Sequence, residues 1–448
     1  MRDHSCVQSS NRTEIIVCGG GPAGIAAALA TARSGCQTTL IERYGFLGGN
    51  LTAGLVNPMM TFHTRSGHQV IGGIAQEIVD RLIAKGGSPG HVSDPVQFVG
   101  SVTPFDPEIF KLVVEQMLLE AGVSIRYHSL VIDAKRQGNR IHSITLATKA
   151  GLETISGDFF IDTTGDADLV SLAGEKYDVG RQADGSTQPM SLIFRLSNVN
   201  LAEVLGYVTD HPHDFHLPEG VETLKATGTI GISGFFSIVQ EGVSDHEIPP
   251  YRDRLLFFGL GGQDVIANVT RITGLSGLDP HDLSLAEAAG RSQAWDYFHF
   301  MQKRIPGFKN ARLVQTGAQV GIRETRRLRE RYIITEDDLL KGTEFPDAVA
   351  LGAYPIDVHS PVDESMHFHG LEPDQYYQIP LRSLIPLDIE NLLVAGRCIS
   401  STHLALAALR VAPTAMATGE AAGRAGGLSV RRGIRPGDLH PSDMSIPV

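Results

Sequence analysis

The stretch Ile15-Ile-Val-Cys-Gly-Gly-Gly-Pro-Ala-Gly-Ile-Ala-Ala-Ala-Leu-Ala30 decides the fold of this chain. Its apolar, β-branched beginning predicts a short buried strand that ends at Cys18. The alanine-rich run after the glycines predicts a helix that reaches about Ser34. A second apolar run over 38–41 predicts the next strand, which ends at Glu42. Strand, glycine turn, helix and strand in this order predict a βαβ unit with two parallel strands.

Three glycines between the first strand and the helix have the spacing G-x-G-x-x-G. Gly19 permits the tight turn, Gly21 lets the backbone approach a pyrophosphate, and Gly24 lets the helix pack closely on the strand. The helix begins at Pro22 and Ala23, where unpaired N–H groups and the positive end of the helix dipole attract phosphates. A βαβ turn without a ligand is the alternative interpretation of the same glycines.

The residues after the second strand extend the dinucleotide pattern. Glu42 is placed to accept hydrogen bonds from ribose hydroxyls, and Arg43 follows it directly. The next loop contains Gly48, Gly49 and Thr52, whose small size would let the backbone pass close to a diphosphate and a ring system. A surface loop is the alternative for this segment, but the complete unit favours a dinucleotide site.

Composition limits the class of protein. The 448 residues exceed one usual core, so two domains are expected. A formal net charge of −12 argues against nucleic acid or an anionic membrane as the main partner. No C-x-x-C pair is present, so neither a dithiol centre nor a zinc site is expected from the four cysteines, Cys6, Cys18, Cys36 and Cys398. A polar start and the lack of a long apolar run predict a cytoplasmic protein without a membrane span.

The glycine fingerprint, Glu42 and the Gly-Gly-x-x-Thr loop resemble the FAD-dependent oxidoreductases of the glutathione-reductase-like class. Within this class the chain resembles a large FAD-oxidoreductase family related to fumarate-reductase flavoproteins. The resemblance implies an α/β fold, with a Rossmann-like parallel-sheet FAD-binding domain and an inserted α+β substrate domain. We expect the FAD-binding domain over 13–187 and 316–430, the substrate domain over 188–315, and tails over 1–12 and 431–448.

A second cofactor segment follows a predicted meander. Strands near 130–135, 141–148 and 152–155 lead to a further apolar strand that begins at Asp158 and ends in Thr163-Thr-Gly-Asp166. The segment resembles the Ala-Thr-Gly-Asp motif of these flavoproteins, with Thr163 in place of alanine. The resemblance implies that three residues contact the cofactor: Thr164, Gly165 and Asp166.

The middle of the chain has a different pattern of predicted strands and helices. Strands are expected over 190–196, 234–240, 255–260 and 265–273, and a helix over 284–304 with Ser284 as its N-cap and Glu287 at the capping-box position. Three histidines, His211, His213 and His216, lie in a Pro- and Asp-rich stretch that favours a solvated loop over a metal site. No second dinucleotide fingerprint follows, so the electron acceptor or donor is not identified by the sequence. A flavin halogenase is not expected, because Trp295 is the only tryptophan.

The segment 317–332 is rich in arginine, with Arg323, Arg326, Arg327, Arg329 and Arg331 inside nine residues. A Gly-Ile-Arg-Glu-Thr-Arg segment recurs in the family that the chain resembles. We expect Arg323 to hold a substrate carboxylate through two parallel hydrogen bonds. A solvated or ion-paired face is the alternative. Further polar candidates for the site follow this segment: His359, His367 and His369.

The third cofactor segment is the strand that ends in Gly396 and Arg397. The resemblance places this strand end at the diphosphate and ribityl part of FAD. It also places the start of the Ala/Gly-rich helix, at Ala412, beside the pyrimidine end of the flavin, where the helix dipole stabilises negative charge.

Two polar residues lie between that strand and that helix. We expect His403 to accept a proton from the substrate, because histidine is the usual acid–base group near neutral pH. Arg410 would add positive charge next to the flavin or an anionic substrate. The alternatives are a structural histidine and an ion-paired arginine, in which case the base lies among three other residues: His63, His359 and Tyr354.

These features predict a protein that binds FAD rather than FMN and acts as a dehydrogenase or reductase on a small polar organic molecule. Hydride would pass between the substrate and flavin N5. A flavin monooxygenase and a non-catalytic flavin-binding redox protein are the alternatives, and a homo-oligomer is compatible with the sequence. No metal is expected.

Overall fold

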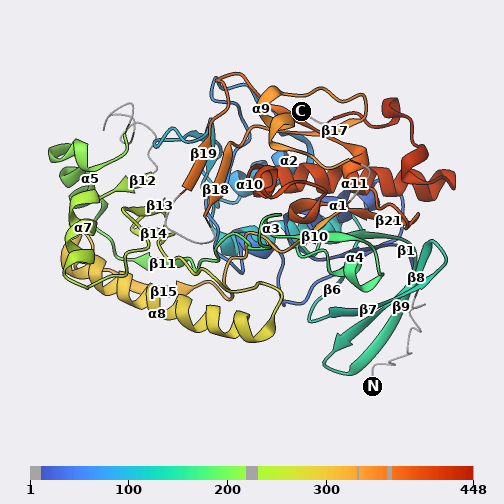
Figure 1. The fold of residues 1–448 in the computed structure, drawn as a ribbon, viewed down its shortest axis with the longest axis horizontal. Helices are drawn as coiled ribbons and strands as arrows, with labels where there is room; N and C mark the ends of the chain where they lie inside the picture. Colours follow the sequence, from blue (N-terminus) through green and yellow to red (C-terminus); the bar gives the residue numbers. More distant parts are fainter. Residues whose placement is uncertain (1–11, 218–223, 225–230, 330–331, 361–365, 447–448) are drawn as a thin grey trace.

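The computed structural model describes residues 12–217, 224, 231–329, 332–360 and 366–446. Figure 1 shows a parallel sheet flanked by α1 and α11 at one end of the molecule. An antiparallel sheet with α5, α7 and α8 lies at the other end. The α/β class predicted from the sequence is therefore confirmed, with a parallel dinucleotide-type sheet and a separate α+β region.

Both ends of the chain contribute to the parallel sheet. Its five parallel strands follow the order β6 (Ser124–Arg126), β2 (Thr38–Ile41), β1 (Arg12–Cys18), β9 (Gly151–Asp162) and β21 (Leu392–Val394). The last residues of β1 and β9, over 15–18 and 159–161, are apolar and buried on both faces of the sheet.

The predicted meander is present, with one correction. β7 (Leu130–Gln137) and β8 (Arg140–Thr148) pair antiparallel, and β8 pairs with the first half of β9. Two separate strands, over 152–155 and from Asp158 onward, were predicted where the structure has the single strand β9. Gly157 does not break this strand, because its bare backbone lies against the side chain of Ile16 and continues the pairing with β1.

Two glycine-bearing helices pack against each other over the sheet. α1 (Pro22–Arg33) lies beside α11 (Ala412–Arg432), as Figure 1 shows. A side chain at Gly419 would overlap the carbonyl oxygen of Ala23, and one at Gly423 would overlap that of Ala27. The two backbones approach this closely only because both positions are glycine.

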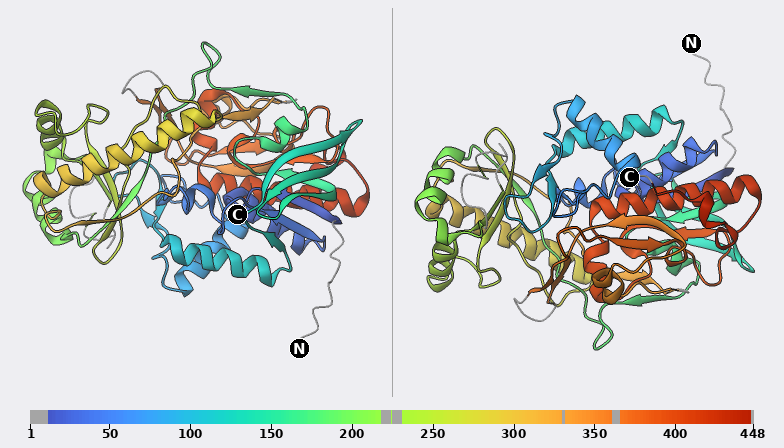
Figure 2. Two further views of the ribbon diagram at one scale, coloured as in Figure 1. Left: turned by 90° about the horizontal axis from the view of Figure 1, so that it is seen from below. Right: turned by 90° about the horizontal axis from the view of Figure 1, so that it is seen from above.

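The second lobe has its own sheet and core. Its antiparallel strands follow the order β12 (Gly231–Gly234), β13 (Leu255–Gly261), β14 (Asp264–Ala267), β11 (Phe194–Ser197) and β15 (Arg312–Thr316). Buried apolar residues between 190 and 322 form a cluster separate from the core under the parallel sheet. Figure 2 shows the long α8 lying along this lobe and reaching toward the rest of the molecule.

One strand of the middle region was predicted wrongly. The segment 234–240 is not a strand, because β12 ends at Gly234 and the helix α7 (Phe236–Ser244) begins two residues later. The Asp214 carboxylate accepts hydrogen bonds from the backbone N–H and the hydroxyl of Ser237, at 2.7 and 2.9 Å. This contact from a distant loop stabilises the first turn of the helix. The sequence pattern of residues 234–240 alone does not reveal it.

The N-cap of α8 was also placed wrongly. α8 (Pro280–Arg304) begins four residues before Ser284, because Asp279 accepts hydrogen bonds from the N–H groups of His281 and Asp282 and Pro280 occupies the first helical position. The Ser284 hydroxyl instead donates to the Pro280 carbonyl, at 2.7 Å.

Smaller elements complete the fold. α2 (Gly73–Ala84) and α3 (Pro107–Glu120) cover α1, and the Asp106 side chain caps α3. The remaining elements are β3 (Met59–Met60), β4 (Val92–Ser93), β5 (Ser101–Thr103), α4 (Asp168–Leu172), β10 (Tyr177–Val179), α5 (Leu201–Asp210), β16 (Arg326–Leu328), α9 (Glu336–Lys341), β17 (Ala348–Gly352), β18 (Ile356–His359), β19 (Met366–His369), β20 (Tyr377–Pro380) and α10 (His403–Leu409).

The glycines of the first turn give a matched pair of variants. Gly24→Ala should destabilise the fold by at least ~1–3 kcal/mol, because the new methyl group would overlap the Gly19 carbonyl oxygen. Gly21→Ala should leave the stability of the cofactor-free protein nearly unchanged, because its methyl group would meet only Gly49 Cα, at 3.9 Å. It should nevertheless weaken cofactor binding at least ~10-fold, about 1.4 kcal/mol. Urea unfolding and a cofactor titration measure the two effects, and equal loss of stability in both variants would contradict this distinction.

Candidate active site

One cavity of about 1420 Å³ extends from the carboxyl ends of the parallel strands to the antiparallel sheet of the second lobe. Gly19 and Glu42, which follow β1 and β2, line one end. Arg252 and Asn268, which flank β13 and β14, line the other. Ligands of open parallel sheets bind at the carboxyl ends of the strands, so this location is the expected one.

Most of the residues predicted to bind the cofactor line this cavity. They are Gly19, Gly21, Pro22, Ala23, Glu42, Arg43, Gly49, Thr164, Gly165, Asp166, Gly396, Arg397 and Ala412. Three others are not among its lining residues. Gly24 packs against the Gly19 carbonyl, Gly48 has a left-handed φ of 111°, and the Thr52 hydroxyl donates to Leu47 O at 2.7 Å. These three shape the backbone of the neighbouring turns.

Glu42 is fixed at the edge of the cavity. Its two carboxylate oxygens accept hydrogen bonds from the N–H groups of Gly20, at 2.7 Å, and Tyr44, at 2.8 Å. Burial raises the pKa of Glu42, while these two N–H groups favour the ionised form. Next to it, Arg43 donates to Gln319 Oε1 at 2.8 Å. A carboxylate held in this way can still accept hydrogen bonds from a ribose through its remaining lone pairs.

Two helices begin at the cavity without a capping side chain. Neither Gly21, the N-cap of α1, nor Val411, the N-cap of α11, makes a side-chain hydrogen bond to its helix. Ala23 and Ala412 line the cavity at these two helix starts. Uncapped N–H groups and the positive ends of two helix dipoles suit a diphosphate and a ring that gains negative charge. The residues therefore fit a flavin dinucleotide.

A buried ion pair connects the second and third predicted cofactor segments. Arg397 Nη2 lies 2.6 Å from Asp166 Oδ1, and Arg397 Nε donates to Gly165 O at 2.7 Å. Arg397 also donates to the carbonyl of Ile322, and Thr325 donates to Asp166 at 2.7 Å. Arg397 and Asp166 thereby hold the loop after β9 against the arginine-rich segment.

Four arginines converge on the end of the cavity away from the glycine turn: Arg252, Arg271, Arg323 and Arg410. Arg323 Nη1 donates to Pro189 O at 2.6 Å, and Arg410 Nη2 donates to Asp357 O at 3.3 Å. Burial, followed by the charge of Arg410, lowers the pKa of Arg323 to about 9. Arg323 therefore remains a cation at neutral pH and faces the cavity.

The other arginines of the same segment have different roles. Arg326 pairs with Asp168 at 2.9 Å, Arg327 pairs with Glu324, and Arg329 is exposed. Arg331 lies outside the described residues. The alternative of a solvated or ion-paired face thus applies to these neighbours and not to Arg323.

The strand β18 brings an acid and a histidine to the arginines. His359 Nε2 lies 3.4 Å from Asp357 Oδ2, and the Tyr354 hydroxyl lies 3.5 Å from the same oxygen. Burial lowers the pKa of His359 to about 4, although Asp357 opposes this shift. Burial alone would raise the pKa of Asp357, but His359, Arg410 and Arg323 outweigh it and hold this pKa below its usual range. At neutral pH the cavity therefore contains a neutral imidazole beside an ionised carboxylate.

His403 is not among the residues that line the cavity. Its Nδ1 lies 2.8 Å from Glu324 Oε2, and the same buried carboxylate pairs with Arg327 and accepts the backbone N–H of Gln188 at 3.0 Å. These contacts tie α10 to the two places where the chain passes between the lobes. The geometry favours the structural alternative for His403 over the expected role as proton acceptor.

The other candidate histidines differ in their position relative to the cavity. His63 Nδ1 is hydrogen bonded to Ser101 Oγ at 3.0 Å and does not line the cavity, whereas His367 and His369 are exposed on β19. His216 lines the cavity, and His211 stacks on Tyr207 with ring centroids 4.3 Å apart.

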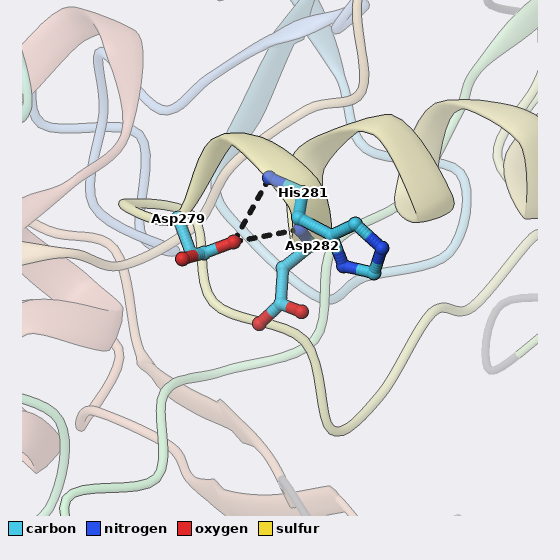
Figure 3. A group of neighbouring side chains, drawn as sticks. All are labelled: Asp279, His281 and Asp282. Carbon is cyan, nitrogen blue, oxygen red and sulfur yellow. Dashed lines mark hydrogen bonds between the residues drawn. The ribbon is translucent and has the colours of Figure 1, made fainter.

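Figure 3 shows the one group of metal-type ligands found in the described part of the chain: Asp279, His281 and Asp282. Their ligand atoms lie within 4.8 Å of one another at the exposed start of α8. The Asp279 carboxylate is already the helix cap, as the dashed lines show. The cap explains this grouping without a metal.

Several cavity residues were not singled out from the sequence: Arg252, Asn268, Arg271 and Asp357. For Asp357 a signal exists, because it is two residues from His359 in a strand and therefore faces the same side. The other three lie near strand ends of the second lobe, where the sequence shows no motif. Only the packing of the two lobes turns them toward the cofactor end.

The glycine turn, the acid after β2 and two uncapped helix starts around one cavity define a dinucleotide-binding α/β protein. The family described as "FAD dependent oxidoreductase" matches residues 14–445. The chain belongs to this family, so it is an oxidoreductase and an enzyme, and its cofactor is FAD. The predicted cofactor and enzyme class are thereby confirmed.

Solved structures were also compared. The flavin-dependent brominase Bmp2 has 13% identity and a TM-score of 0.49, with 94% of this chain and 80% of that chain covered. A geranylgeranyl bacteriochlorophyll reductase-like protein from Thermoplasma acidophilum has 12% identity and a TM-score of 0.48, with 97% and 81% covered. The myxobacterial chondrochloren halogenase CndH has 13% identity and a TM-score of 0.48, with 96% and 77% covered. No curated protein matches the sequence.

The assignment to the FAD-dependent oxidoreductases rests on the family match over residues 14–445 alone. Among the described residues, no helix combines the length and the apolar character that crossing a membrane requires.

Removal of His403 tests its structural role. His403→Ala should cost about 1–3 kcal/mol of unfolding free energy, because it removes one hydrogen-bond partner of the buried Glu324 carboxylate, which keeps Arg327 and the Gln188 N–H. The FAD content of the folded fraction should stay normal. Urea unfolding and the flavin absorbance measure these two quantities. Full stability together with a large loss of flavin reduction would instead restore the catalytic role.

Proposed function

We propose that this enzyme is a dehydrogenase or reductase that transfers hydride between FAD and a small anionic organic substrate. The observation that carries the proposal is the convergence of Arg323 and Arg410 with Asp357 and His359 on one end of the cofactor cavity. Bound FAD supplies the ring that accepts or donates the hydride. The residues of the chain supply the anion site and the group that moves the proton.

Arg323 and Arg410 are the proposed anchors for a substrate carboxylate. Both come from the C-terminal part of the chain, and Arg410 lies two residues before Ala412 at the start of α11. Their hydrogen bonds, to Pro189 O and Asp357 O, each use one terminal nitrogen and orient the guanidinium groups. A planar guanidinium with free N–H groups can bind a carboxylate through two parallel hydrogen bonds.

His359 is the proposed proton acceptor. Because its pKa is about 4, the imidazole is neutral at physiological pH and can take a proton from a substrate hydroxyl or amine. Asp357 contacts one ring nitrogen, orients the ring and stabilises the imidazolium that forms. Burial raises the pKa of Tyr354, so its hydroxyl stays protonated and serves as a hydrogen-bond donor to Asp357.

The direct test is anaerobic mixing of the FAD-loaded enzyme with pools of small organic acids, with the flavin absorbance followed near its visible maximum. A substrate of the dehydrogenase direction bleaches the flavin without any other reductant. Arg323→Lys should then raise the half-saturating substrate concentration at least ~10-fold, because an ammonium group cannot form the two-pronged contact. FAD content should remain normal.

Arg326→Lys is the matched control, since Arg326 belongs to the same segment but pairs with Asp168. An unchanged half-saturating substrate concentration in Arg323→Lys would contradict the assignment of Arg323 as the carboxylate anchor. Oxygenated product formed together with NAD(P)H consumption would support a monooxygenase instead. A flavin that no acid and no reduced metabolite alters would support the non-catalytic redox protein.

The pH dependence tests His359. A base works in its deprotonated form, so a pKa of about 4 keeps His359 active throughout the neutral range. The rate constant of flavin reduction should therefore be flat between about pH 5 and pH 8 and fall only toward pH 4. His359→Gln should lower that constant by ~10²–10⁴ at neutral pH. A wild-type rate that halves near pH 6.5 would point to an unshifted histidine elsewhere.

A further inference from the structure

The arginine end of the cavity has more positive than negative charge. Of the carboxylates that line this half, Asp253 pairs with Arg254 at 2.7 Å, and Asp94 accepts three backbone N–H groups at 2.8–3.0 Å. Asp357 is the carboxylate that remains near the cluster. Among the described residues, no ion pair is made by Arg252, Arg323 or Arg410.

The cations lie on two walls that come from different parts of the chain. Arg323 and Arg410 belong to the C-terminal part of the chain, and Arg410 lies two residues before the start of α11. Arg252 precedes β13 and Asn268 follows β14, and these two neighbouring strands belong to the second lobe. Asn268 is held next to β13 by a hydrogen bond from its N–H to Leu256 O, at 2.9 Å. A ligand that fills the cavity would therefore meet one anion site on each wall.

The wall of the second lobe has unused hydrogen-bonding groups. Arg252 Nε is a buried donor that has no hydrogen-bond partner among the described residues. The side-chain oxygen of Asn268 is also buried without a partner there, but it can only accept hydrogen bonds, so an anion would bind to the amide NH₂ group of Asn268. Within the described part of the chain, the Arg252 guanidinium makes one hydrogen bond, from Nη2 to Thr270 O at 3.3 Å. Burial lowers the pKa of Arg252, and the charge of Arg271 adds to this shift. A buried cation whose N–H groups lack acceptors lowers the stability of the folded protein unless a ligand supplies negative charge and acceptor atoms.

We infer that Arg252 and Asn268 form a second anion-binding subsite, so that the substrate carries two acid groups. One acid group binds to Arg323 and Arg410 near the flavin, and the other binds to Arg252 with Asn268 on the second lobe. This inference rests on the proposed function and narrows its substrate class. The second acid group is a carboxylate or a phosphate-type group, since a guanidinium binds either one through two hydrogen bonds.

The experiment uses the FAD-loaded enzyme and four pairs of acids with equal carbon number. The diacids malonate, succinate, glutarate and adipate are each compared with propionate, butyrate, valerate and hexanoate by isothermal titration calorimetry. At least one diacid should bind ~10-fold or more tightly than its monoacid. 3-Phosphonopropionate, set against succinate, tells which kind of second acid group the subsite prefers.

Two variants locate the subsite. Arg252→Gln should abolish the preference for the diacid and leave the affinity for the monoacid within about twofold. Asn268→Leu should reduce the same preference and serves if Arg252→Gln does not fold. The double variant Asp253→Asn, Arg254→Gln is the matched control, because it removes an arginine and its paired carboxylate from the cavity lining without changing the net charge. It should leave both affinities unchanged.

The outcomes separate this inference from the proposed function. A diacid preference that survives in Arg252→Gln and Asn268→Leu overturns the subsite, as does the absence of any preference or of any binding in the wild type. Flavin bleaching by a monoacid, with no effect of Arg252→Gln, keeps the proposed function and removes the subsite. A diacid preference that Arg252→Gln abolishes supports the subsite even where no acid bleaches the flavin, and in that case only the proposed reaction fails.

Discussion

The close contact of α1 with α11 is the constraint on which the cofactor cavity depends. Gly419 and Gly423 lie against the backbone oxygens of Ala23 and Ala27, positions that any side chain would overlap. This contact joins segments almost four hundred residues apart and sets where α11 begins. Because α11 begins at the cavity, its free N–H groups face the same space as those of α1. Without the glycines, the C-terminal part of the chain would lie farther from the first βαβ unit.

The two ends of the cavity balance charge in different ways. At the cofactor end, Arg397 and Asp166 neutralise each other, and Glu42 is held by backbone N–H groups. At the far end, the guanidinium groups of Arg323 and Arg410 make hydrogen bonds to carbonyl oxygens, which fix their direction without cancelling their charge. The paired charges at the cofactor end hold the backbone around the cavity in place. The uncompensated arginines at the far end are suited to bind an anion from solution.

The buried network around Glu324 explains how the two lobes keep their relation. Glu324 contacts His403 on α10, Arg327 in its own segment and the backbone of Gln188 at the exit to the second lobe. Arg323 is the direct neighbour of this carboxylate in the chain. The network thus helps to hold Arg323 in the cavity wall. Its own three side chains, those of Glu324, Arg327 and His403, do not line the cavity.

Local sequence determined the first βαβ unit, because each step there is set by neighbouring residues. Gly19, which has a left-handed φ, and Gly24, which lies against the Gly19 carbonyl, specify a turn that other residues cannot form, and Gly21 leaves its side open toward the cofactor. The N-cap of α3 and the end of β2 follow from short-range chemistry. The same reasoning failed at Ser284, where the Asp-Pro pair just upstream starts the helix first, and at 234–240, where Asp214 supports a helix from a distance.

Only the tertiary structure decided which polar side chains share the cavity. In sequence, His403 and Arg323 are equally plausible site residues, and Arg252 and Asn268 carry no motif at all. The packing of one lobe on the other turns Arg252 toward Arg323 and leaves His403 on a buried carboxylate. Cofactor recognition could be predicted because it uses backbone geometry within a few residues. The substrate side could not, because it is built by side chains from separate strands that meet only after both cores have formed.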